Sequence, residues 1–240
     1  MANGIYVAVS GATSRMQQLN VLSNNLANAQ TTGFKRSEVS FSAVEGGEDP
    51  SGTNDRHFVK TNQSRPSLES GEYLRTDNPL DLAIQGDAFF KIEAEGEDRL
   101  TRDGRLMVAS DGLLRTINGH AVLDDQGGAI FIPPEHVPRI DSTGRIFSNE
   151  AELGQLALVG VDPQTDLQRD GNHLFIPPED AAILGPDSGV RVQQGWVEGS
   201  NAKPLQLMVQ LVDVQRTFDA MQKAISTYQD MDRNAIRITR

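Results

Sequence analysis

The chain has no cysteine among its 240 residues. This absence excludes a disulfide framework, a thiolate metal site and a cysteine nucleophile, and it makes folding independent of the redox state of the compartment. Aromatic residues are also scarce, and Trp196 is the only tryptophan. Because 38% of the residues are hydrophobic, the chain nevertheless has enough apolar side chains to build a core.

Long apolar runs are missing as well. No stretch approaches the about 18 consecutive apolar residues that mark a spanning helix, so we expect no integral membrane segment. The first 14 residues have no basic region and are interrupted by Asn3, Gly4, Ser10 and Gly11, which is not the pattern of a cleavable secretory signal. We therefore expect a protein that is soluble, or that leaves the cytosol by a route that does not read such a signal.

Basic residues are few in the middle of the chain. The formal net charge is -11, yet residues 1–40 and residues 201–240 each hold more basic than acidic groups, so the acidic excess lies between them. Binding to phosphates needs a basic surface, and we therefore do not expect nucleic acid as a partner. Nearly neutral ends can pack together, whereas an acidic middle favours exposure to water. This pattern suggests the hypothesis that the ends assemble and the middle is displayed.

The usual catalytic signatures are absent, including G-x-S-x-G, H-E-x-x-H, the P-loop and G-x-G-x-x-G. The histidines His57, His120, His136 and His173 lie far apart and are interpreted as turn or surface residues. Acidic pairs such as Asp124-Asp125 are typical of solvated turns. We therefore expect no enzymatic activity, no catalytic residue, no cofactor and no metal site.

Apolar residues recur at heptad spacing at both ends of the chain, which predicts an amphipathic helix at each end. The predicted assembly interface consists of Ile5, Val9, Ala12, Met16, Leu19, Leu22, Leu26, Leu211, Val214, Phe218, Met221, Ile225 and Tyr228. These faces either pack on the protein's own β domain or pair with each other, or with copies of themselves, in a coiled-coil-like arrangement. The repeats are short, so the pattern leaves both interpretations open.

The middle of the chain alternates short apolar runs with two-residue turn signals. The signals are Asp103-Gly104, Asp111-Gly112, Asn118-Gly119, Gly127-Gly128, Thr143-Gly144 and Asp170-Gly171. Such pairs supply the positive φ angles of tight β turns and predict successive hairpins. The predicted fold is α+β, with a central antiparallel all-β domain flanked by the two terminal helices.

Four segments follow from this pattern. Residues 1–41 form an N-terminal assembly helix and turn, residues 42–75 an extended linker, residues 76–199 the β domain, and residues 200–240 a C-terminal assembly helix. The linker prediction rests on the polar, glycine-rich stretch after Phe41, which is rich in residues that break regular structure.

Three blocks of the sequence resemble one known family. The string from Ser23 to Lys35 resembles the N-terminal signature of the bacterial flagellar rod and hook proteins, in which an amphipathic helix breaks at a Thr-x-Gly-Phe turn. The motif residues are Ser23, Asn24, Asn25, Leu26, Ala27, Asn28, Thr32, Gly33 and Phe34. A second block, from Arg75 to Gly104, is similar to the start of the family's β domain, and a third, beginning at Gly195-Trp196-Val197-Glu198-Gly199-Ser200-Asn201, is similar to its C-terminal helix.

The resemblance implies a structural subunit of the flagellar basal-body rod, the shaft that crosses the periplasm and transmits torque to the hook. It implies packing of the terminal helices between subunits, so the expected partners are copies of the chain and neighbouring rod subunits. It also implies export through the flagellar type III export apparatus without a cleaved signal, in keeping with the absent signal peptide.

Alternatives remain within and outside the family. The chain length and the short segment after Phe41 most resemble proximal rod members, and distal rod members are the alternative. Ala88 departs from the family pattern, which commonly has glycine before the paired aromatics. A hypothesis of another class is a periplasmic β-domain enzyme acting on peptidoglycan, which requires a cleft with paired carboxylates of shifted pKa.

Overall fold

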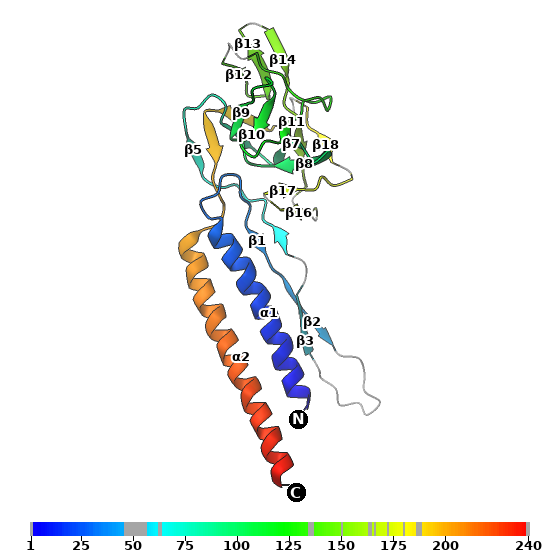
Figure 1. Cartoon of the computed structure of the whole chain (residues 1–240), viewed down its shortest axis with the longest axis vertical. Coiled ribbons are helices and arrows are strands. Elements are labelled where there is room, and N and C mark those ends of the chain that lie inside the picture. Colours follow the sequence, from blue (N-terminus) through cyan, green and yellow to red (C-terminus); the bar gives the residue numbers. More distant parts are fainter. Residues whose placement is uncertain are drawn as a thin grey trace. The chain divides into compact units, whose positions relative to one another are not determined.

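The computed structural model describes residues 2–45, 57–61, 64–133, 137–149, 151–162, 165, 167–171, 173–179, 181–185 and 189–238. Within these ranges, only the backbone is described for residues 2–6, 43–45, 57–61, 232 and 235–238. The chain forms two compact units (Figure 1). The first comprises residues 1–27, 37–65 and 203–240, and the second comprises residues 28–36 and 66–202.

The first unit is built on two long helices, α1 (Ala2–Ala27) and α2 (Pro204–Ile238). They lie side by side and antiparallel, with Gly11 of α1 against Met221 of α2 (Figure 1). A β-carbon built on Gly11 would lie 3.3 Å from the Met221 sulfur, a tight contact that a small shift of the flexible Met221 side chain would relieve. The predicted C-terminal helix is confirmed, and Pro204 occupies the first turn, where its missing N–H costs nothing.

The same unit contains an antiparallel hairpin, β2 (Phe41–Glu45) and β3 (His57–Thr61), which packs beside α1. The short strands β1 (Ser37–Glu38) and β4 (Arg65–Pro66) also pair. The stretch expected to be an extended linker, residues 42–75, therefore contains paired strands, because hairpin pairing satisfies its backbone N–H and C=O groups. Its glycine-rich part, residues 46–56, lies outside the described residues.

The second unit is an antiparallel β structure, as the sequence predicts. Its main sheet has the order β16-β17-β8-β7-β11-β10-β9, with β15 pairing β7 and β18. The strands of this sheet are β7 (Ala88–Ala94), β8 (Glu97–Thr101), β9 (Leu106–Val108), β10 (Leu114–Thr116), β11 (Ala121–Val122), β15 (Leu158–Gly160), β16 (Arg169–Asp170), β17 (Leu174–Phe175) and β18 (Ala182–Ile183).

Smaller sheets complete this unit. One has the order β12-β13-β14, and two antiparallel pairs join β19 to β6 and β20 to β5. The bounds are β5 (Tyr73–Arg75), β6 (Leu82–Gln85), β12 (Arg139–Ile140), β13 (Arg145–Ser148), β14 (Ala151–Gln155), β19 (Arg191–Gln194) and β20 (Trp196–Glu198). The α+β class predicted from the sequence is therefore confirmed.

Strand β7 divides the apolar core of the β unit into two clusters. Phe90, Ile92 and Ala94 belong to the larger cluster, whereas Phe89 belongs to a second cluster that includes Phe175. Successive side chains of a strand point to opposite faces, so the paired aromatics serve one cluster each. This arrangement explains why β7 begins with three consecutive apolar residues, Ala88–Phe90, before apolar residues alternate with Lys91 and Glu93.

Most of the predicted turn glycines adopt the expected conformation. Gly112, Gly119, Gly127 and Gly144 all have positive φ, as tight β turns require. Gly104 does not, and the prediction of a turn at Asp103-Gly104 is wrong. Gly104 instead lies against strand β6, where a β-carbon built on Gly104 would be 1.7 Å from the carbonyl oxygen of Leu82. No helix in the described part of the chain is long and apolar enough to cross a membrane.

Replacing Gly104 by alanine should lower the free energy of unfolding of the β unit by about 1–3 kcal/mol or more, because the methyl group overlaps backbone that cannot move aside. Gly185→Ala is the matched control, since a β-carbon there meets nothing within 4 Å and φ is not positive; we expect a change within about 0.5 kcal/mol. Urea titration followed by the fluorescence of Trp196 measures both. Equal effects of the two substitutions would contradict the proposed steric role of Gly104.

Candidate functional site

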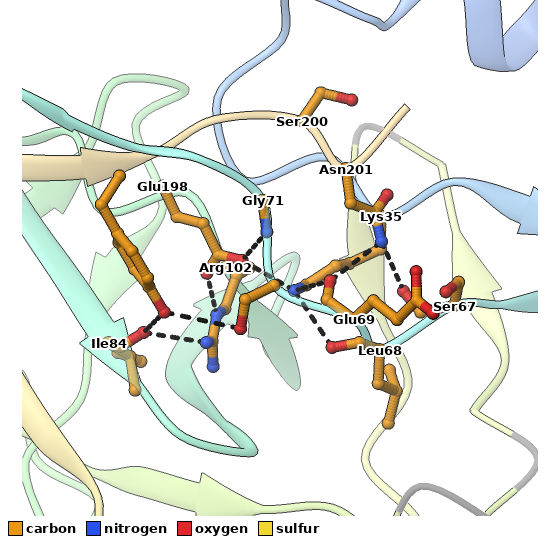
Figure 2. Close-up of polar contacts among 12 residues, drawn as sticks. Lys35, Ser67, Leu68, Glu69, Gly71, Ile84, Arg102, Glu198, Ser200 and Asn201 are labelled. Carbon is orange, nitrogen blue, oxygen red and sulfur yellow. Dashed lines mark hydrogen bonds and ion pairs between the residues drawn. The ribbon is translucent and has the colours of Figure 1, made fainter. Parts of the chain in front are cut away.

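Three charged side chains meet inside the β unit around the carboxylate of Glu198 (Figure 2). We call Lys35, Arg102 and Glu198 the Glu198 cluster, and all three are almost fully buried. Oε1 of Glu198 accepts from Lys35 Nζ and from the backbone N–H of Gly71, each at 2.8 Å. Oε2 accepts from Nε of Arg102. One carboxylate therefore joins three segments that are distant in the sequence.

The two cations have their other donors occupied as well. Lys35 Nζ also donates to the carbonyl oxygens of Leu68 and Glu69, at 3.3 and 2.8 Å, which uses all three ammonium protons. The guanidinium of Arg102 donates to the carbonyls of Ile84, Gly86 and Ala88. With these donors already bound to the protein, the Glu198 cluster is suited to holding chain segments together rather than to binding a substrate.

The electrostatics of the Glu198 cluster agree with this structural role. Burial alone would raise the pKa of Glu198, but the charges and hydrogen bonds of Arg102 and Lys35 outweigh it and lower that pKa. Burial lowers the pKa of Lys35, against the attraction of Glu198. Among the described carboxyl groups with a clear shift, Asp111, Asp141 and Glu198 all have a lowered pKa, whereas a general acid needs a raised one.

Asn201 extends the Glu198 cluster at the segment that leads to α2. Its side-chain oxygen accepts from the backbone N–H of Arg36 at 2.6 Å. Its amide nitrogen, which lies near Ser67 and Glu69 in Figure 2, donates to the carbonyls of these two residues at 3.0 and 2.9 Å. In the helical unit, Asn25 makes a similar two-way contact with the backbone N–H and C=O of Ser37, both at 2.8 Å. In an irregular segment, backbone N–H and C=O groups have no partner in a helix or strand, and each asparagine side chain hydrogen-bonds to such groups.

Gly33 and Phe34 fix the turn that precedes Lys35. Gly33 has φ of 68°, and a β-carbon there would lie 2.4 Å from the backbone nitrogen of Asp103, so both conformation and space require glycine. Its N–H donates to the carbonyl of Glu198 at 2.7 Å. The ring of Phe34 is buried, in edge contact with His173 and beneath the guanidinium of Arg169. Gly33 and Phe34 therefore hold this turn against the β unit.

The Glu198 cluster lies close, along the chain, to the points where the chain passes between its two units. These passages follow residues 27, 36, 65 and 202. Lys35 and Arg36 precede the second passage, Ser67 follows the third, and Asn201 precedes the fourth. The chain segments at the last three passages are therefore tied to one another, inside the β unit, by the contacts of Glu198 and Asn201.

The residues predicted for the assembly interface fall into two groups. Those of α2 mostly lie on its covered face: Val214 is buried, and Leu211, Phe218, Met221 and Ile225 are half-buried, whereas Tyr228 is exposed.

In α1 the predicted stripe is divided. Ala12 and Leu22 are buried, and Leu19 and Leu26 are half-buried. Val9 and Met16 are exposed, and the side chain of Ile5 lies outside the described residues. The structure therefore places part of the stripe inside the helical unit and leaves part of it facing solvent.

None of Lys35, Arg102 and Glu198 is predicted from the sequence as a site residue, although each lies in a different one of the three family-like blocks. The sequence signal available for each of these residues is a charge within a block whose pattern indicates turns and strands. The ion-pair partners are 96 and 163 residues apart along the chain, a separation that no local pattern encodes. His120 and His173 are not part of a metal-ligand cluster within the described residues, and the side chains of His57 and His136 lie outside them.

Glu198→Gln should lower the free energy of unfolding of the β unit by about 3–5 kcal/mol, because it leaves two buried cations without their counter-charge. Asp77→Asn, which breaks an exposed ion pair with Arg75, should cost about 1 kcal/mol or less. Urea titration followed by Trp196 fluorescence measures both.

The same titration repeated at several pH values tests the lowered pKa of Glu198. The stabilisation from an acid with a lowered pKa is present above its unfolded pKa and is lost as the pH falls through its folded pKa. The wild type should therefore lose stability on acidification, and Glu198→Gln should lose less. Identical acid dependence in the two proteins would show that Glu198 is not the group responsible.

Three family models match the chain. They are described as flagella basal body rod protein (residues 5–35), flagellar hook protein FlgE/F/G D1 domain (residues 83–148) and flagellar basal body rod FlgEFG protein C-terminal (residues 193–238). Lys35, Arg102 and Glu198 fall one in each matched range. The Glu198 cluster therefore links three segments that define this group of proteins.

Curated relatives match over nearly the whole chain. The flagellar basal-body rod protein FlgF of Mesorhizobium japonicum is 34% identical over 91% of this chain and 90% of its own length. FlgF of Caulobacter vibrioides is 31% identical over 98% of this chain and 97% of its length, and FlgG of Agrobacterium fabrum is 31% identical over 94% and 95%. The chain therefore belongs to the flagellar basal-body rod protein family and is a FlgF-like member of it.

Proposed function

We propose that the chain is a non-enzymatic structural subunit of the proximal rod of the bacterial flagellum. Its terminal helices pack against copies of the chain and neighbouring rod subunits, and the assembled shaft transmits torque across the periplasm to the hook. The observation that carries the proposal is that α1 and α2 lie together yet keep apolar side chains exposed, whereas the β unit buries its own core.

The energetics favour assembly through the helices. Burying a large apolar side chain contributes about 1.5–3 kcal/mol, so several partly exposed residues along α1 and α2 supply a substantial driving force when copies meet. In proteins, most of the stability of a helix comes from the packing of its apolar face. Neighbouring subunits would supply the missing packing, and a shaft built in this way resists bending because its helices are close-packed.

The Glu198 cluster gives the subunit a route for mechanical load. Force carried along the chain between the helical unit and the β unit crosses the segments at the four passages. Contacts of Glu198 and Asn201 hold the segments at three of these passages to one another. A buried ion cluster contributes geometry more than net stability, which suits a connection that must keep its shape.

The proposed location follows from the family and the composition. We propose that the subunit resides in the periplasmic part of the basal body and is exported by the flagellar type III apparatus without a cleavable signal. The chain has no cysteine, so its folding after export needs no disulfide formation. The acidic middle makes nucleic acid an unfavourable partner.

The second candidate is the distal rod subunit, since a FlgG relative matches over almost the same length as the FlgF relatives. The segment between Phe41 and Arg75 is the feature that separates the two, because the ends of the chain are similar in both.

An in-frame deletion in the source bacterium tests the proposal. We expect loss of motility, with isolated basal bodies that retain membrane rings and lack the rod and hook in electron micrographs. A rod that is present but ends early would instead favour the distal candidate. Motile cells with intact basal bodies would contradict both.

Phe218→Asp should abolish rod assembly and motility, because a charge replaces a half-buried side chain on the covered face of α2. Gln222→Asp is the matched control, since it adds the same charge at an exposed position one turn away. The urea midpoint of the β unit, followed by Trp196, should be unchanged in both. Normal rods in the Phe218→Asp strain would contradict assembly through the helices.

A further inference from the structure

The imidazole of His173 has two unfavourable features that the structural role of the Glu198 cluster does not explain. His173 lies at the turn between β16 and β17 and has φ of 64°, in the left-handed region that residues other than glycine rarely adopt. Its Nδ1 atom is buried and has no hydrogen-bond partner among the described residues. A strained backbone and an unpaired buried nitrogen are both costly, and together they indicate a functional constraint at this position.

The ring of His173 covers Phe34. The two rings meet edge to face, with centroids 5.3 Å apart and an angle of 84° between their planes. The guanidinium of Arg169 lies over the same phenyl ring, 4.9 Å from its centroid, and donates to the backbone carbonyl of Lys35. His173 and Arg169 therefore hold the segment of Phe34 and Lys35 against the β16–β17 hairpin.

A proton on this imidazole is unfavourable while the ring covers Phe34. Protonated Nδ1 would need an acceptor, and none of the described residues provides one. The added charge would lie near Arg169 of β16 and near Arg105 in the loop after β8, whereas the turn of Phe34 presents a neutral ring. Burial and these two cations lower the pKa of His173. Only Asp103 opposes them, and its carboxylate already accepts from Arg105 at 2.7 Å.

We propose that His173 is a pH-sensitive switch for the turn of residues 28–36. While the imidazole is neutral, it holds the β16–β17 turn over Phe34. When the imidazole is protonated, this turn moves outward, so that Nδ1 reaches water and Phe34 loses its cover. Because His173 is only half-buried and follows the exposed Gly171 by two residues, a small movement is sufficient. The inference goes beyond the proposed function and does not rest on it, since it concerns the folded chain before any assembly.

The direction of the pH dependence follows from linkage between proton binding and opening. A histidine whose pKa is lowered in the closed state binds its proton more readily once the turn is open, so acid favours opening. The closed state is fully favoured above the ordinary histidine pKa of 6.5, and it loses stability as the pH falls from there to the pKa of the closed state. Between about pH 7.5 and about pH 5.5, the equilibrium constant for opening rises by at most about tenfold.

Hydrogen exchange of the purified full-length chain measures this opening. The backbone N–H groups of Phe34 and Leu174 report it, because each closes a turn through a backbone hydrogen bond. After division by the intrinsic rate at each pH, exchange at both should rise severalfold, to a limit of about tenfold, over this pH range. The N–H of Lys91, which is hydrogen-bonded within the sheet, is the reference and should change by less than about twofold.

Two variants remove the titrating group in different ways. His173→Phe keeps a ring over Phe34, whereas His173→Asn loses the ring but adopts a positive φ more easily. Neither side chain can take up a proton in this pH range, so exchange at Phe34 should be independent of pH in both variants, whatever its level at neutral pH. His120→Asn is the matched control, because it removes a histidine beside another turn of the β unit, and it should keep the wild-type response.

Titration of the imidazole by NMR completes the test. The ring signals of His173 in the wild type should titrate below the ordinary histidine pKa of 6.5. Titration at or above that value would overturn the switch, as would wild-type exchange at Phe34 that does not change with pH, or an unchanged pH response in both His173 variants. Glu198 does not mimic the response, because its pKa is lowered from an ordinary value of 4.5 and its carboxylate stays ionised over this range.

Discussion

The burial of one carboxylate with two cations determines how the rest of the β unit can be arranged. Removing Glu198, Lys35 and Arg102 from water is costly, and the cost is offset only when every donor and acceptor is satisfied. To meet that condition, three segments must come together. They are the turn before Lys35, the end of the strand before Arg102, and the segment that leads from Glu198 to α2. The apolar clusters on either side of β7 fill the interior, and the Glu198 cluster holds these three segments together.

The two units of the chain therefore differ in how completely they bury their side chains. The β unit has a buried core, close-packed glycines and a polar cluster whose donors are bound to protein groups. The helical unit buries one face of each helix and leaves others open. A subunit that folds in one part and remains unsaturated in another is suited to an open assembly, in which each new copy supplies the missing packing of the last.

The absence of catalytic features has a physical counterpart in the described residues. The Lys35 donors and the Glu198 oxygens are already committed to protein partners. The shifted carboxyl groups have lowered rather than raised pKa values. These features suit a permanent structural role, since a catalytic acid or base must exchange protons with a substrate at the pH of the compartment.

Local patterns were sufficient for the elements that depend on neighbouring residues. The period of the apolar residues predicts the C-terminal helix, the Asp-Gly and Asn-Gly pairs predict most of the tight turns, and the three motif blocks indicate the family. The same reasoning fails at Gly104, because a glycine required by the approach of Leu82 looks, in sequence, like a turn glycine. A positive φ and a lack of space for a β-carbon both favour glycine, and only the three-dimensional structure shows which of the two reasons applies.

The sequence by itself therefore determined the α+β class, the antiparallel middle, the terminal helices and the membership of the rod family. Each of these depends on the pattern of residues close together in the chain or on a contiguous motif. Only the tertiary structure decided that Lys35, Arg102 and Glu198 form one cluster, and which members of the apolar stripes are covered. Both depend on contacts between residues far apart in the chain, such as the 163 positions that separate Lys35 from Glu198. Periodicity places a side chain on a face of a helix, but the packing of the other elements decides whether that face is buried.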